Sequence, residues 1–242
     1  DLIELKVSTL GDQHVLNPAF NWPDPVIKVN GEQVQQGERY KIVINNIDAI
    51  VELIWSKPLT NCHAMFEGLS NIKQFKFTNF DSSQVTDMSN MFESCSNLTS
   101  LDLSHFNTER VKNMANMFKD CDSLATLNIS EFDTSQVTDM SYMFDKCRSL
   151  ISLEIGNFKT GKVENMAGMF QGCVLIEELP ISNFDVSAVT NTAKMFHSCT
   201  NLKSLDLSKF DTRKVKSMTA MFSSLTLKYL NWLKKHIKNT KC

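Results

Sequence analysis

The residues of this chain with the greatest chemical potential are its seven cysteines, because thiolates bind metals and form disulfides. Five of them recur at intervals of 26 residues: Cys95, Cys121, Cys147, Cys173 and Cys199. Leu69 and Leu225 hold the same position at the two ends of the series, which indicates a buried apolar position. Side chains that point in parallel from stacked repeats neither face one another for a disulfide nor surround a metal tetrahedrally. We therefore expect a structural column of free, buried thiols.

Cys62 and Cys242 lie outside that column, near opposite ends of the repeated region, so we do not expect them to pair. Cys242 could pair with another chain, with further sequence, or with nothing. The chain begins at Asp1 without a signal-like segment, as a processed or trimmed chain would. No apolar run has the length that crosses a bilayer, so we expect membrane association only through parts outside this chain.

The other reactive residue types form no arrangement typical of an active site. The five histidines are scattered, the eight glycines form no phosphate-binding loop, and no nucleophile-elbow motif accompanies the serines. Aspartates recur at one turn of the repeat: Asp81, Asp133, Asp185 and Asp211. Asn107 and Lys159 interrupt this column, and Asx turns explain it without calcium, which stays the alternative. We expect no catalytic residues, no cofactor and no metal.

Composition and charge set further bounds on function. Hydrophobic residues at 42% and charged residues at 21% are typical of a folded protein with ample material for a core. The formal net charge of -2 provides no general attraction for nucleic acid, so we expect no nucleic-acid partner.

A repeat of 26 residues must position all these side chains. The Met-Phe dipeptide recurs without insertion, with its Phe at 66, 92, 118, 144, 170, 196 and 222. Val85, Met88, Met91, Phe92 and Cys95 are spaced by three and four, which predicts an amphipathic helix. Leu101 and Leu103 alternate as in a short strand. The pattern predicts an α/β solenoid of 26-residue coils, each a short parallel strand plus a helical segment, with the second Phe column (Phe80 to Phe210) stacked inside.

The two ends of the chain depart from the repeat. Residues 1–60 predict an N-terminal β-rich capping module, with strands near 3–7, 26–29, 40–44 and 50–55 and a hairpin turn at Asn30-Gly31. Residues 61–225 form the predicted solenoid. Residues 226–242 show a helical apolar stripe with lysines and predict a C-terminal capping helix.

The repeat motif, as in Phe132-Asp-Thr-Ser-Gln-Val-Thr-Asp-Met-Ser-Tyr-Met-Phe-Asp-Lys-Cys147, closely resembles the BspA-like leucine-rich-repeat surface proteins of bacteria and protists. The opening of the repeat looks more like the protist-type members. The resemblance covers residues 61–225. It implies leucine-rich-repeat-type coils and a cell-surface or secreted protein with adhesive and protein-binding roles, and it implies no catalytic residues.

Recognition is expected on the outward positions of the predicted strands. The candidate partner-binding residues are Asp102, Ser104, Asn128, Ser130, Glu154, Ser182, Asp206 and Ser208. These side chains are small, polar and mildly acidic, and the strand face lacks the Tyr, Trp and Arg that usually anchor tight interfaces. Weak multivalent contacts therefore fit this face better than one tight site. Two sequons, at Asn97 and Asn128, are candidate glycosylation sites.

Two functional hypotheses follow from these observations. The first is a non-catalytic cell-surface or secreted protein that acts in adhesion through its solenoid surface, with other proteins and also glycans as partners. The second is a structural component of an extracellular filament or surface appendage, with self-assembly or co-assembly. Both place the protein outside the cell or on its surface.

Overall fold

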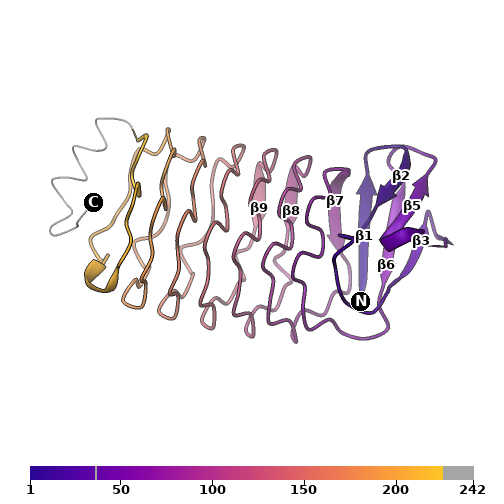
Figure 1. Ribbon diagram of the computed structural model, residues 1–242, viewed down its shortest axis with the longest axis horizontal. Helices are drawn as coiled ribbons and strands as arrows, with labels where there is room; N and C mark the ends of the chain where they lie inside the picture. Colours follow the sequence, from indigo (N-terminus) through magenta and orange to yellow (C-terminus); the bar gives the residue numbers. More distant parts are fainter. Residues whose placement is uncertain (36, 226–242) are drawn as a thin grey trace.

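The computed structural model describes residues 1–35 and 37–225, and it shows one elongated row of stacked coils with a β module at its N-terminal end (Figure 1). The first coil begins at residue 61, and later coils begin every 26 residues. The predicted C-terminal capping helix at 226–242 and Cys242 lie outside the described residues.

The N-terminal module contains two antiparallel sheets. The larger has the strand order β4-β3-β6-β1-β7, and the smaller pairs β2 with β5. The strand bounds are β1 Leu2–Val7, β2 Gly11–His14, β3 Val26–Val29, β4 Glu32–Gln33, β5 Lys41–Ile44, β6 Ile50–Ile54 and β7 Ile72–Phe77, with a short 3₁₀ turn η1 at Glu38–Tyr40. Asn30 and Gly31 both have positive φ (50° and 85°), as the predicted two-residue hairpin between β3 and β4 requires.

Strand β7 joins the module to the coils, because it belongs to the first coil and yet pairs antiparallel with β1. Within its coil, β7 holds the place that β8 Ser100–Asp102 and β9 Thr126–Asn128 hold in the next two coils. Leu5 of β1 and Phe75 of β7 face each other and are both buried. The module therefore covers the open edge that the first coil would otherwise expose to other strands.

The predicted helical segment is wrong, and with it the α/β fold class. The described residues contain no α-helix, and none of their elements is a helix long and apolar enough to cross a membrane. In place of a helix, each coil has two consecutive tight turns. In the second coil, the Met91 N–H donates to the Met88 carbonyl at 3.3 Å, and the Cys95 N–H donates to the Phe92 carbonyl at 3.1 Å.

A left-handed residue in each turn rules out the helix. Asn90 and Ser94 have φ of 60° and 61°, whereas every residue of an α-helix has negative φ. The equivalent residues of all seven coils have positive φ: Ala64, Asn116, Tyr142, Gly168, Lys194 and Ala220 at the first turn, and Gly68, Asp120, Lys146, Gly172, Ser198 and Ser224 at the second. Two consecutive four-residue turns, like an α-helix, place apolar side chains in the core at spacings of three and four. The sequence pattern of a pair of turns is therefore the same as that of a helix.

The backbone hydrogen bonds of this segment run between coils. The N–H groups of Asn90 and Phe92 donate to the carbonyls of Ala115 and Met117 in the next coil, both at 2.9 Å. The same alternate donors repeat in the later coils; for example, the Phe118 N–H donates to the Met143 carbonyl at 2.9 Å. Each coil is therefore fixed in register with the next one along the whole turn segment.

Regular strands are sparse in the coils. Where the sequence predicts a parallel strand in each coil, the described residues pair as parallel strands only in β8 and β9. A single bridge joins Glu178 to Ser204 two coils further along. Further single bridges link the start of one coil to the start of the next, from Asp87 to Ser217. A short 3₁₀ turn, η2, spans Thr212–Lys214.

The core consists of columns of identical side chains, which the equal length of the coils permits. The stacked rings belong to the Met-Phe column and not to the predicted Phe80–Phe210 column. From Phe92 to Phe222, successive rings of the Met-Phe column lie 5.7–5.9 Å apart with interplanar angles of 5–10°. Of the other column, Phe80 and Phe106 make a tilted contact at 5.1 Å.

Substitution of Asn116 tests the left-handed turns. Asn116 is half-buried with φ of 57°, a conformation that a β-branched residue adopts only with strain. Asn116→Val should lower the free energy of unfolding by about 1–2 kcal/mol, whereas Asn116→Gly should leave it within about 0.5 kcal/mol. Urea unfolding measures both. Thr126→Val, on an exposed strand position, is the control and should change little; an equal loss in Asn116→Val and this control would contradict the turn assignment.

Candidate interaction surface

The predicted partner-binding residues lie at two repeat positions, two residues apart, in different coils. Asp102, Asn128, Glu154, Asp206 and Ser208 are exposed, and the serines at 104, 130 and 182 are half-buried. Asp102 in β8 pairs directly with Asn128 in β9. The residues therefore belong to two neighbouring rows of the coil stack: Asp102, Asn128, Glu154 and Asp206 form one, and the four serines form the other.

Three of these residues also cap their own turns. The Oδ1 atoms of Asp102, Asn128 and Asp206 accept the backbone N–H two residues later at 3.0, 3.3 and 2.9 Å. The backbone bond from Ser104 lowers the pKa of Asp102, and the hydroxyl and backbone bonds from Ser208 lower the pKa of Asp206. Both carboxylates thus stay charged at neutral pH, while part of their role is to hold the local backbone.

A groove of about 560 Å³ crosses the coils that begin at residues 139, 165 and 191. Three predicted residues line it, Glu154, Ser182 and Asp206, whereas Asp102, Ser104, Asn128, Ser130 and Ser208 are not among its lining residues. The lining also includes Glu178 and Pro180, together with Ser152, Ser204 and the leucines at 153, 179 and 205. The structure therefore places the hollow part of the predicted face toward the C-terminal half of the stack.

The groove lies where the strand ladder stops. Pro180 has no N–H to donate, and the regular pairing of β8 with β9 is not continued by the strand positions of the next two coils. The next coil also departs from the repeat, because Thr192 takes the place of the usual Met. The turn segments of both coils stay regular, since the Met169 N–H donates to the Met166 carbonyl at 3.3 Å and the Met195 N–H donates to the Thr192 carbonyl at 3.1 Å. The departure from regularity is confined to the strand side, beside Pro180.

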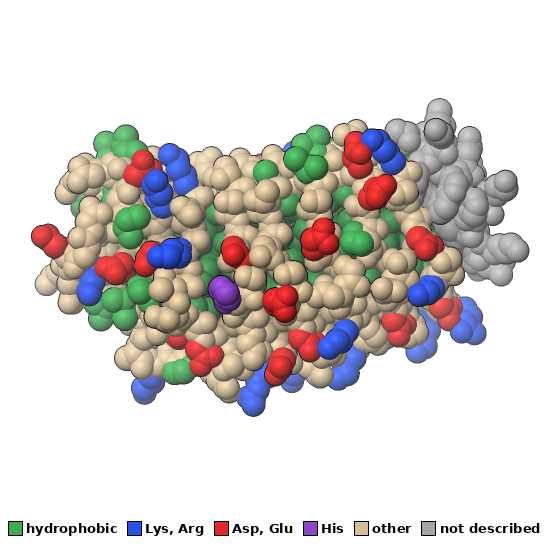
Figure 2. Space-filling view, turned by 180° about the vertical axis from the view of Figure 1, so that it is seen from behind, with side chains coloured by type: hydrophobic (Ala, Val, Ile, Leu, Met, Phe, Trp, Pro, Cys, Tyr) green, Lys and Arg blue, Asp and Glu red, His purple; other side chains and the backbone are tan. Residues whose placement is uncertain are grey.

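The groove has acidic walls over an apolar floor. The Glu154, Glu178 and Asp206 side chains are exposed, Leu153 and Leu205 are buried beneath them, and no lysine or arginine lines the groove. Figure 2 shows one face of the stack with acidic side chains spread singly among small uncharged ones, while most basic side chains gather along its lower edge. Such a groove has the chemistry to accept cationic side chains from another protein.

Two large apolar side chains are exposed in the same part of the stack. Ile151 is 63% exposed and directly precedes Ser152 of the groove, and Leu175, in the following coil, is 42% exposed. Exposed apolar side chains close to a polar groove are typical of protein interaction surfaces. The sequence reasoning missed both, because the position of Ile151 holds lysine, threonine, alanine or glutamate in other coils, and the position of Leu175 holds asparagine or serine.

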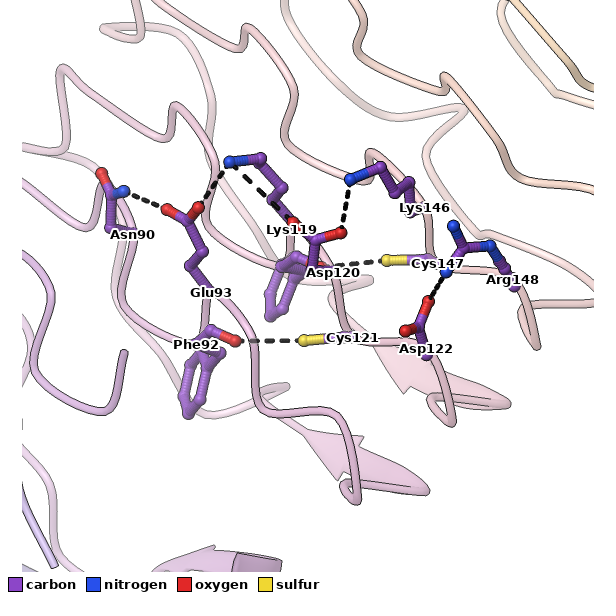
Figure 3. Close-up of polar contacts among 11 residues, drawn as sticks. Asn90, Phe92, Glu93, Lys119, Asp120, Cys121, Asp122, Lys146, Cys147 and Arg148 are labelled. Carbon is purple, nitrogen blue, oxygen red and sulfur yellow. Dashed lines mark hydrogen bonds and ion pairs between the residues drawn. The ribbon is translucent and has the colours of Figure 1, made fainter. Parts of the chain in front are cut away.

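Next to the turn segment, ion pairs link one coil to the next (Figure 3). The Glu93 carboxylate accepts from Lys119 at 2.6 Å, and the Asp120 carboxylate accepts from Lys146 at 2.8 Å. Asp122 and Arg148 form a similar pair. These pairs are half-buried, or exposed as between Asp122 and Arg148, and they join equivalent turns of neighbouring coils, so we regard them as support for coil register and not as a site.

The cysteine column lies beneath these pairs. Each of the five thiols donates to the carbonyl of the phenylalanine in the preceding coil, as Cys121 does to Phe92 and Cys147 to Phe118, both at 3.1 Å. All five are free and buried, and so is Cys62. Burial raises the pKa of each thiol, to about 12 for Cys121 and Cys199. These thiols are chemically quiet and act as hydrogen-bonding core residues.

The other predicted sites occupy ordinary turn positions. The turn aspartates form Asx turns, as Asp133 does with the Ser135 N–H at 2.8 Å, and the described residues hold no group of three or more His, Cys, Asp or Glu suited to a metal. Both sequon asparagines are exposed. The Asn97 side chain donates to the Ser70 carbonyl at 2.7 Å, and the Asn128 side chain accepts from Ser130.

The column of Asp145, Gln171 and His197 was not singled out from the sequence. Each of the three has one buried polar atom without a partner among the described residues. Asp145 is only 2% exposed, and burial raises its pKa to about 6. The Tyr142 ring of the same coil as Asp145 lies over Gly168, where a Cβ would come within 2.3 Å of the ring. Lys146, Lys119 and a hydrogen bond with Gln171 offset only part of the cost of burying this carboxylate, so its charged form destabilises the stack at this point.

Comparison with known families assigns the repeat region to a family. The sequence model described as "Mycoplasma protein of unknown function, DUF285" matches residues 60–153 and again residues 150–241. The chain belongs to this family. The first DUF285 match begins beside the start of the first coil and the second begins at residue 150, so residues 1–59, which carry most of the β module, lie outside both. Neither the curated proteins nor the solved structures gave a match to this DUF285 chain.

Asp145 makes a pH-dependent contribution to the stability of this DUF285 chain. Its folded pKa of about 6 lies above the usual 3.8, so the folded state favours the protonated carboxyl. Stability should therefore fall as pH rises from about 4 through about 6, by at most about 3 kcal/mol. Asp145→Asn should unfold at higher urea concentration than the parent chain at pH 7.5 and at an equal concentration near pH 4.

The control for this prediction is Asp122→Asn, because Asp122 pairs with Arg148 at the surface. It should change the free energy of unfolding by less than about 1 kcal/mol at either pH. A lower stability of Asp145→Asn at pH 7.5 would show that the groups around the charged carboxylate more than offset the cost of its burial, and it would contradict the prediction.

Proposed function

We propose that this DUF285 chain is a non-catalytic, cell-surface or secreted protein of the BspA-like type, which binds other proteins through the groove at residues 152–206. The repeat motif supports the BspA-like assignment, and the groove supports the binding role. A row of Glu154, Glu178 and Asp206 over buried leucines is a surface that a lysine- or arginine-containing segment complements.

The groove lacks the residues that give a single tight contact. Its lining has no Tyr, Trp or Arg, and its carboxylates are exposed to water, which weakens each ion pair. Useful attachment then depends on many copies that act together on one partner surface. An adhesin displayed at high density on a cell meets this condition.

A multivalent binding measurement tests the proposal. Beads that carry the full chain are exposed to an immobilised lysine-serine peptide, and dissociation is followed by biolayer interferometry. Glu154→Gln, Glu178→Gln and Asp206→Asn together should weaken binding at least about 10-fold, because the three carboxylates supply the attraction. The amide at 206 can still accept the Ser208 N–H, so the fold should be retained.

The matched control removes three exposed carboxylates that do not line the groove, by Glu109→Gln, Glu131→Gln and Glu164→Gln. This control variant has the same net charge as the groove variant, and it should weaken binding less than about 2-fold relative to the parent chain, because exposed charges away from the groove are screened by salt. Equal losses in the two triple variants, or no binding by the parent, would contradict the groove as the binding site. Antibody label that reaches the chain only in permeabilised source cells would contradict the surface location.

A further inference from the structure

A larger cavity, of about 730 Å³, lies in the N-terminal module, outside both DUF285 matches. The loop at residues 18–25, the β3–β4 hairpin and the segment around η1 surround it, at the end of the row where β3 and β5 lie (Figure 1). Three aromatic residues line it: Phe20, Trp22 and Tyr40. The groove described above contains no aromatic residue, so the two hollows have different chemistry.

Three side-chain donors hold the loop of this cavity by its backbone. Arg39 Nη1 donates to the Pro18 carbonyl at 3.0 Å, and Trp55 Nε1 donates to the Pro23 carbonyl at 2.9 Å. The Tyr40 hydroxyl lies 3.4 Å from the Phe20 carbonyl. The loop is thus fixed before any ligand arrives, which lowers the entropic cost of binding.

The backbone beside the cavity is strained. Arg39 and Tyr40 have φ of 48° and 64°, and consecutive left-handed conformations are rare for residues other than glycine. The strain turns Arg39 toward the loop while Tyr40 stays buried below the cavity. Strain of this kind persists where the surrounding structure fixes a functional arrangement.

The polar lining selects a neutral ligand with many hydroxyl groups. One carboxylate, Asp24, and one guanidinium, Arg39, offset each other, and the remaining polar side chains include the exposed amides of Asn21, Gln33 and Gln35. Burial and a hydrogen bond to Asp24 raise the pKa of Tyr40 to about 12, so its hydroxyl stays protonated. Amides donate to hydroxyls and accept from them, a carboxylate accepts from them, and an aromatic face packs against the C–H groups of a sugar ring.

An extended peptide fits this cavity poorly. Peptides that add to a sheet need a row of unpaired backbone groups. Here β4 already pairs with β3, since Lys28 lies opposite Gln33, and β4 itself, the outermost strand, is only two residues long and offers no such row. An anionic ligand is also disfavoured, because the one lining cation donates to the loop and the Asp24 carboxylate lines the same cavity.

We propose that this cavity is a saccharide-binding site for a neutral sugar unit, with Trp22 as the stacking platform and Asn21, Asp24 and Gln33 as hydroxyl partners. The site is separate from the groove, so the coil stack and the β module would recognise different partners. A chain with both sites could hold a glycan at one end and a protein along its side.

A glycan array with the full chain as probe tests the site, followed by titration calorimetry with the strongest neutral glycan bound. Trp22→Ala and Gln33→Ala should each weaken that binding at least about 10-fold, through loss of stacking and of hydroxyl contacts. The triple groove variant should bind the glycan as the parent does, which separates this proposal from the protein-binding one.

Gln33→Ala keeps the test valid if Trp22→Ala fails to fold, because the Gln33 side chain is exposed. The site is supported if the parent chain binds a neutral glycan, the variants lose that binding, and Gln33→Ala unfolds at the same urea concentration as the parent chain. No bound neutral glycan on the array, selective binding of anionic glycans alone, or binding unchanged by both substitutions would overturn it.

Discussion

Hydrogen bonds between successive coils are the interaction on which the rest of this structure depends. In the turn segment, alternate N–H groups such as those of Asn90 and Phe92 donate to the next coil and not to their own. Because each coil is 26 residues long, this pairing brings identical side chains together, so the phenylalanine rings stack and each cysteine meets the same carbonyl. The left-handed residues at two positions per coil are what make the pairing possible.

The two candidate sites occur where the regular repeat of the coils is interrupted. The groove opens beside Pro180, at the strand position, while the turn segment of the same coil keeps its bonds to the next. The saccharide cavity lies in the β module that covers the first coil, where loops replace coils. A repeat supplies a rigid frame, and the specific chemistry is carried by the departures from it.

The sequence predicts the period and the buried columns, because burial of Val85, Cys95 or Leu101 requires only that apolar residues recur. It does not predict the direction of the backbone bonds, since two four-residue turns and one helix produce the same apolar spacing. Asn90, Asn116 and Gly168 favour the left-handed conformation, but Tyr142 and Lys194 at the same position obscure that signal. The groove and the cavity depend on segments from different coils or loops, which no local pattern specifies.

Scalar couplings across hydrogen bonds test the central account most directly. In the isotope-labelled chain, the account predicts a coupling between the Phe118 amide nitrogen and the Met143 carbonyl carbon, and another between Asn116 and Ser141, 25 residues apart in each case. A coupling from the Phe118 nitrogen to the Met114 carbonyl carbon would instead show an α-helix and contradict the account.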